Sequence, residues 1–168
     1  MKKVYWDTLE SKGCAAILAK DVEVVPAGTT LYSMSVKNKN AEYQKYADAY
    51  DLRFIFDDDI PQVDFYTVPQ VDIFARDSVG GLFGTVGQTT DIGDAAPVCY
   101  INKSKECFLI ADSLKAFLQM LSSDGDWRTR MVPDHDIVFY KSKADAEHSL
   151  EFLEIHQEIK GNPRKPLK

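Results

Sequence analysis

Short apolar runs, each ended by turn-forming residues, follow one another between residues 63 and 110 and constrain the fold more than any other feature of the chain. Their β-branched and aromatic residues favour strands, and their close spacing is typical of an antiparallel sheet. The polar segment 101–106 predicts a hairpin between the last two runs. The runs are VDFYTV (63–68), VDIFA (71–75), GLFGTV (81–86), PVCYI (97–101) and ECFLI (106–110).

Helical spacing occurs on both sides of these runs. Residues 41–50 place tyrosines at i, i+3 and i+7, and residues 114–121 place leucine and phenylalanine at the same intervals, with Asp112 or Ser113 as N-cap. Capping patterns at 7–10 and 142–145 predict a short helix through residue 18 and a terminal helix through residue 159. We therefore expect an α+β fold with a mixed, mostly antiparallel β-sheet flanked by helices.

Further strands are expected outside the central group. VEVV (22–25) and TTLYSMSV (29–36) flank Pro26-Ala27-Gly28, which predicts a hairpin or a strand pair joined by a turn. LRFIF (52–56) and DIVFY (136–140) are the remaining candidates. The region before residue 54 is therefore expected to contribute both strands and helix.

The length and charge of the chain indicate how many domains it forms and what kind of partner it binds. With 168 residues, of which 45% are hydrophobic, we expect a single domain over residues 1–160 and a basic, flexible tail over 161–168. The net charge of −6 argues against nucleic acid or an anionic membrane as partner and favours a basic protein. No apolar run resembles a signal peptide or a membrane span, so we expect a cytoplasmic protein.

The glycine-rich stretch 80–87 raises the question of a phosphate-binding loop. It lacks the Gly-Lys-Ser/Thr ending of a Walker loop, and the acidic segment 89–94 leads into a strand instead of a helix. We expect these glycines to permit tight turns or close backbone approach, and we expect no cofactor. The glycines are Gly80, Gly81, Gly84 and Gly87.

Residues that could support catalysis are few. The three cysteines lack metal-ligand spacing, and Cys99 and Cys107 lie in apolar runs, where an inert thiol is expected. His148 and His156 are too far apart along a helix to share a metal ion. His135 stands between two aspartates that could orient its ring, although neighbouring residues at a strand entry usually point apart. We expect neither an enzyme nor a metal site.

Acidic residues supply the candidate contact surface. A cluster at 57–64 lacks the pattern of a calcium loop and is either a solvated turn or part of an acidic face for a basic partner, with metal binding as a third alternative. Two aromatic neighbours could act as anchors, and two aspartates of the 87–96 loop could join the face. The candidates are Asp57, Asp58, Asp59, Asp64, Phe65, Tyr66, Asp91 and Asp94.

The stretches DIFARDSVGGLFGTVG (72–87), APVCYI (96–101) and CFLIADSLKAFLQML (107–121) carry a family resemblance. A Gly-Gly pair before an aromatic strand, a strand that begins at Pro97 and continues through Tyr100, and an apolar strand leading into an amphipathic helix resemble the SUKH superfamily of Smi/Knr-like proteins. The similarity covers residues 54 to 121. The long opening helix and the Leu-Pro segment common in that family are not found here.

The resemblance implies an α+β domain and a role in binding. Many bacterial members of the SUKH superfamily are similar to immunity proteins, which neutralise a cognate toxin, often a nuclease, by occluding it. Fungal relatives resemble regulators of cell-wall synthesis. We therefore expect a non-enzymatic immunity protein whose partner is a cognate toxin or another basic protein, with a regulatory or scaffolding protein as the alternative. A homodimer is compatible with both.

Overall fold

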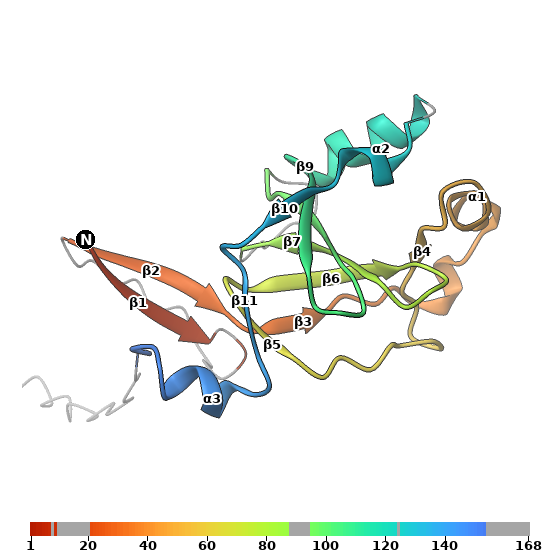
Figure 1. Cartoon of the computed structure of the whole chain (residues 1–168). Helices are drawn as coiled ribbons and strands as arrows, with labels where there is room; N and C mark the ends of the chain where they lie inside the picture. Colours follow the sequence, from red (N-terminus) through yellow and green to blue (C-terminus); the bar gives the residue numbers. More distant parts are fainter. Residues whose placement is uncertain (8, 10–20, 88–94, 124, 154–168) are drawn as a thin grey trace, which may run out of the picture.

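A seven-stranded mixed sheet is the centre of the molecule in the computed structural model, which describes residues 1–7, 9, 21–87, 95–123 and 125–153 (Figure 1). Its strands lie in the order β10-β9-β8-β7-β6-β3, and β4 also pairs with β6. The predicted α+β class is confirmed. The strands are β3 (Thr29–Leu31), β4 (Arg53–Phe54), β6 (Val71–Arg76), β7 (Leu82–Val86), β8 (Val98–Ile101), β9 (Cys107–Ala111) and β10 (Val132–Asp134).

The pairing from β6 to β10 is antiparallel throughout, as the spacing of the apolar runs predicts. The β8–β9 hairpin closes through Asn102, whose backbone N–H donates to the Glu106 carbonyl at 3.0 Å. At the other edge, β3 pairs with β6 in parallel and β4 pairs antiparallel with its far end. Strand β10, a short segment that contains a proline, was not predicted from the sequence.

Strands β6, β7 and β8 at the centre of the sheet are buried on both faces, and successive residues of one strand serve different faces. In β8, Val98 and Tyr100 join the apolar cluster beneath α2, whereas Cys99 and Ile101 join a second cluster on the opposite face. That second cluster is covered by partly buried side chains of the loop before β5 and of β11. Burial of both faces explains why the strands read as nearly continuous apolar runs.

Helices α1 (Ala41–Tyr50) and α2 (Leu114–Ser122) agree with the predicted segments. The Ser113 hydroxyl caps α2 by accepting from the Ala116 backbone N–H at 3.1 Å, which decides between the two candidate caps. Phe117 and Leu121 of α2 are fully buried, but α1 contains no buried residue. Helix α1 therefore stands at the edge of the core. A 3-10 turn, η1 (Val36–Asn38), precedes it.

The described residues also form two separate two-stranded sheets, of which the one at the N-terminus lies at the opposite end from α1 (Figure 1). Strands β1 (Lys2–Asp7) and β2 (Val22–Ala27) pair in parallel, and β5 (Tyr66–Val68) pairs antiparallel with β11 (Val138–Tyr140). The expected pairing of 22–25 with 29–36 is wrong. Gly28 adopts φ 125°, and the chain passes there from the β1–β2 ribbon into β3 of the main sheet.

The terminal helix begins where predicted but ends early. In α3 (Lys143–Glu147), the Ser142 hydroxyl accepts from the Asp145 N–H at 3.2 Å. Residues 151–153 are not helical, because their backbone pairs with that of Tyr5. The Tyr5 backbone N–H donates to the Glu151 carbonyl, and the Tyr5 carbonyl accepts from the Leu153 backbone N–H, each at 2.8 Å. Pairing with β1 places Phe152 in a third apolar cluster. The expected helix at 7–18, Cys14, His156 and the tail at 161–168 lie wholly or largely outside the described residues.

Candidate interaction surface

The glycine-rich turn before β7 is occupied by a carboxylate of the chain itself. Asp77, which is 5% exposed, accepts hydrogen bonds from the backbone N–H groups of Val79 at 3.0 Å and Gly81 at 2.6 Å. The Tyr100 hydroxyl donates to its second oxygen at 2.7 Å. Backbone N–H groups that would have to face a phosphate are therefore already paired with an anion, which supports a structural role for the turn.

Close approach explains two of the glycines. A Cβ atom on Gly81 would overlap the Tyr100 ring, and one on Gly84 would lie 2.5 Å from Val71 Cγ1. Gly80 and Gly87 have φ values of 91° and 90°, a region that other residues rarely adopt. The remaining two residues of the quoted motif are also structural. Pro97 accepts from the Val86 N–H at 2.9 Å, and Tyr100 is 7% exposed.

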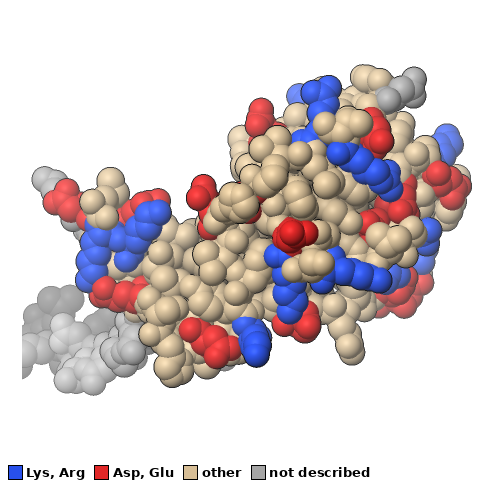
Figure 2. All heavy atoms as spheres, viewed as in Figure 1, with Lys and Arg blue, Asp and Glu red and all other residues tan. Residues whose placement is uncertain are grey.

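The acidic residues at 57–64 are exposed, but each lies beside a donor from elsewhere in the chain. Lys39 pairs with Asp58 at 2.9 Å, Lys105 pairs with Asp64 at 3.4 Å, and Arg76 pairs with Asp59. Asp57 accepts from the Ser33 hydroxyl at 2.5 Å. On the face shown in Figure 2, acidic and basic side chains are interspersed. Three of the four charges thus have a neighbouring cation, which weakens the attraction of this cluster for a basic partner.

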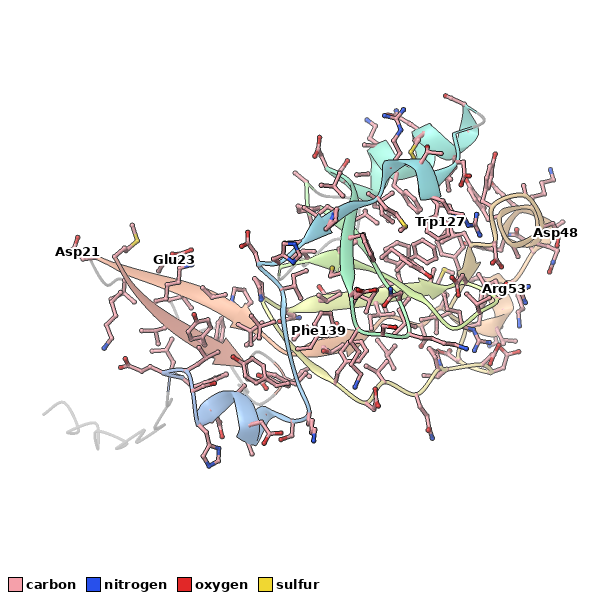
Figure 3. All side chains as sticks on the ribbon, viewed as in Figure 1. Asp21, Glu23, Asp48, Arg53, Trp127 and Phe139 are labelled. Carbon is pink, nitrogen blue, oxygen red and sulfur yellow. The ribbon has the colours of Figure 1, made fainter. Side chains whose placement is uncertain are left out.

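The two aromatic candidates beside this cluster lie largely within the fold. Tyr66 is 9% exposed and donates a 2.9 Å hydrogen bond to Asp7, so it is not a surface anchor. Phe65 is half-buried and packs edge-on against Phe139 at 5.3 Å between ring centroids. Phe139 lies at the junction of the β1–β2 ribbon and the main sheet (Figure 3). Asp91 and Asp94 fall outside the described residues.

The side chains considered for catalysis are dispersed. His135 and His148 are exposed, and the described segments contain no group of three or more metal-ligating side chains that could hold an ion. Cys99 and Cys107 are buried thiols. A hydrogen bond with Cys107, followed by burial, raises the pKa of Cys99 well above its usual value, as expected of an inert thiol. No described helix combines the length and apolar character needed to cross a bilayer.

An open groove of about 360 Å³ lies between α1 and α2, over the β4 and β6 edge of the main sheet. Its walls are mainly aromatic. Tyr43 and Tyr46 of α1 contact Phe54 edge-on at centroid distances of 5.3 and 5.7 Å, and Phe54 lies 6.1 Å from Phe74. Tyr32, which is 53% exposed, adds a further ring at the rim. The groove thus presents partly exposed rings beside α1, the helix that lies at the end of the molecule away from the β1–β2 ribbon (Figure 1).

The other side of the groove is aliphatic, with one charged residue at its edge. Met34, Leu114 and Leu118 are half-buried, and Glu42 is exposed in the first turn of α1. Within the described segments, the Glu42 carboxylate makes no hydrogen bond or ion pair. A single unpaired acid therefore borders an apolar surface.

The position of α1 depends on a buried tryptophan, Trp127, to which its last residue is hydrogen-bonded. Trp127, at the start of η2 (Trp127–Arg130), is only 2% exposed and packs against Tyr100 and Phe83. Its indole N–H donates to the carbonyl of Tyr50, the last residue of α1, at 2.9 Å. Figure 3 shows Trp127 directed toward the interior. Trp127 therefore anchors the groove from below and does not itself form a contact face.

The sequence reasoning identified the tyrosines of α1 as a helical pattern but not as part of a groove. Their i, i+3 spacing is equally typical of a core-facing stripe. The sequence feature that could have indicated a groove is the low apolar content of α1 apart from its tyrosines, because it limits how deeply the helix can be buried.

No family model matches the chain, and neither a curated protein nor a solved structure matches it.

Proposed function

We propose that this protein is a non-enzymatic binding protein that acts in the cytoplasm and neutralises a cognate bacterial toxin by occlusion. The SUKH resemblance of residues 54–121 suggests this class. The observation that supports it best is the aromatic groove between α1 and α2. Tyrosine is enriched at the centres of protein interfaces, because it contributes a large apolar area and a hydroxyl at low conformational cost.

Occlusion requires a prearranged surface more than reactive groups. The groove is supported from below by the buried cluster that includes Phe74 and Trp127, and the hydrogen bond from Trp127 to Tyr50 holds the end of α1. Ordering these side chains on binding would cost little, since they already pack against one another. In this proposal the partner inserts a side chain into the groove, and the surrounding surface excludes water.

Rescue of growth tests the proposal. Expression of a toxin domain encoded by a neighbouring gene should arrest growth, and co-expression of this protein should restore it and allow the two proteins to be co-purified. Failure of rescue with every neighbouring toxin domain would contradict toxin neutralisation and favour the alternative, a regulatory or scaffolding protein linked to cell-wall synthesis.

A pair of variants tests whether the groove is the contact surface. Tyr32→Ser removes a ring that is 53% exposed at the groove rim, so folding should be nearly unaffected while affinity for the toxin domain falls by about tenfold or more. Val79→Ser, which removes an apolar side chain that is 61% exposed in the β6–β7 turn, is the matched control and should bind normally. Equal affinity of both variants would exclude the groove.

A further inference from the structure

In the described part of the chain, three aromatic rings already lie against a cation. Arg128 lies 4.3 Å from the centroid of Trp127, Lys39 lies 5.1 Å from that of Phe56, and Lys105 lies 5.8 Å from that of Phe65. Among the described residues, no such contact involves the rings of the groove. The groove therefore contains aromatic faces of the same kind without an internal cation.

The groove also has an acid without a counter-ion. Asp58 and Asp59, in the loop after β4, are paired with Lys39 and Arg76, and Asp48 of α1 accepts a hydrogen bond from the neutral amide of Gln44 at 2.8 Å. Glu42 makes no such contact within the described part of the chain, and it lines the groove. A carboxylate beside partly exposed aromatic rings favours a cation that also has apolar or planar character.

We propose that the groove between α1 and α2 binds an arginine side chain of the partner, with its guanidinium stacked on Tyr43 or Tyr46 and paired with Glu42. This inference rests on the proposed function, because it names the anchor through which the partner is bound. A guanidinium fits better than an ammonium, because it is planar, weakly hydrated and able to stack on a ring while donating to a carboxylate. Among the described residues, the shortest cation–ring distance is likewise that of an arginine, Arg128.

The size of the groove agrees with a single side chain. Its volume of about 360 Å³ lies at the lower end of the range for small-ligand sites, roughly 300–1,000 Å³. Leu114 and Leu118 on α2 face this space from the side opposite the tyrosines, so the methylene groups of an arginine would contact them.

The negative charge of Glu42 is also favourable in the first turn of α1, since the helix dipole is positive there.

The experiment uses the full chain and small probes, so it needs no partner. Butylguanidinium is titrated into the isotope-labelled protein, and amide and aromatic NMR shifts are followed. Butylurea, its neutral analogue of similar shape, is the control ligand. We expect saturable shifts at Tyr43, Tyr46 and Leu118 with butylguanidinium and at least several-fold weaker binding of butylurea.

Two charge-neutralising variants on the same helix make the test specific. Glu42→Gln should weaken butylguanidinium binding about two- to fivefold, the range expected for an exposed ion pair. Asp48→Asn also removes one negative charge from α1, but Asp48 does not line the groove, so this variant should bind butylguanidinium as the wild type does. Equal binding of butylurea, no saturable shift at the groove, or an unchanged affinity of Glu42→Gln would overturn the inference.

The outcomes separate this inference from the proposed function. If the toxin domain is neutralised and Tyr32→Ser weakens its binding, but butylguanidinium does not bind, the proposed function stands and the arginine anchor is overturned. If butylguanidinium binds with the expected dependence on Glu42 but no toxin domain is neutralised, the site is supported and toxin neutralisation fails.

Discussion

Tyr100 and Asp77 form a buried pair that holds the glycine turn before β7: the tyrosine hydroxyl donates to the carboxylate at 2.7 Å. The same carboxylate accepts the backbone N–H of Gly81 at 2.6 Å. Because the ring of Tyr100 also packs at 4.7 Å from Trp127, the pair links the turn to the core beneath the groove.

The hydrogen bond between Tyr100 and Asp77 should contribute measurably to stability. Tyr100→Phe keeps the ring but removes one donor from a buried carboxylate, so the free energy of unfolding should fall by about 1–3 kcal/mol. Urea denaturation measures it. Tyr140→Phe is the control, since Tyr140 is half-buried and its hydroxyl accepts a long, 3.4 Å hydrogen bond from Ser149, so this change should lower stability much less. Equal losses would contradict the assignment.

The same pair should make stability depend on alkaline pH. Burial, followed by the hydrogen bond to Asp77, raises the pKa of Tyr100 well above its ordinary value of about 10. The neutral hydroxyl is favoured in the folded state, so its contribution is complete below about pH 10 and is lost as pH rises toward the folded-state pKa. The stability difference between wild type and Tyr100→Phe should therefore shrink above about pH 10. A difference that stays constant would refute this.

Gly81 should be required because of the Tyr100 ring and not because of its backbone angle. Gly81→Ala would bring a Cβ into the ring, and overpacking of this kind typically costs about 1–3 kcal/mol. In a Tyr100→Ala background, where the ring is absent, the added cost of Gly81→Ala should be much smaller. Thermal or urea unfolding of the four proteins gives the coupling. Additive losses would mean that the collision is unimportant.

The buried thiols should be unreactive in the folded protein. A Cys14→Ser variant retains only Cys99 and Cys107, whose thiols are both buried, and the pKa of Cys99 is raised. An exposed-thiol reagent at neutral pH should modify neither residue until denaturant is added. Rapid modification of either thiol under native conditions would indicate access that the buried arrangement does not provide.

The hypothesis of an acidic contact face predicts an effect on association rate. Changing Asp57, Asp58, Asp59 and Asp64 together to Asn removes four negative charges and leaves Lys39, Arg76 and Lys105 unpaired. Association with a basic toxin domain should slow several-fold at low salt, and the deficit should diminish as salt screens the exposed charges over about 8 Å. Stopped-flow mixing measures the rate.

A compensated variant is the control for this experiment. Neutralising the three cations in addition to the four acids changes the local charge little, so its association rate should be close to that of the wild type. If it is as slow as the acid-only variant, the aspartates act through direct contacts. If neither variant is slowed, the cluster is a solvated turn.

Much of the central sheet was predictable because most of its strands pair with strands that are neighbours in the sequence. Strands β6 to β9 follow one another along the chain, and turn residues separate them, so each run pairs with its neighbour in sequence. Helix α2 was predictable for the same reason, since its cap and its apolar spacing lie within about ten residues. Sequence alone thus determined the α+β class.

Contacts between distant segments were decided only by the tertiary structure. Residues 22–27 pair with β1 instead of 29–36. Phe152 leaves the predicted helix because its neighbours Glu151 and Leu153 hydrogen-bond the backbone of Tyr5 and its ring packs against that of Tyr5. These choices depend on which apolar faces meet across the whole molecule, and local propensity does not encode that.

The candidate surface changed for the same physical reason. The sequence showed four clustered aspartates, but not that Lys39, Arg76 and Lys105 would lie beside three of them. It showed the tyrosine spacing of α1, but not that Leu118 would face it across a groove whose lining includes Glu42, an acid with no partner among the described residues. Residue type and spacing determined which elements form, whereas the packing of those elements decided which charges are neutralised and which rings remain open to a ligand.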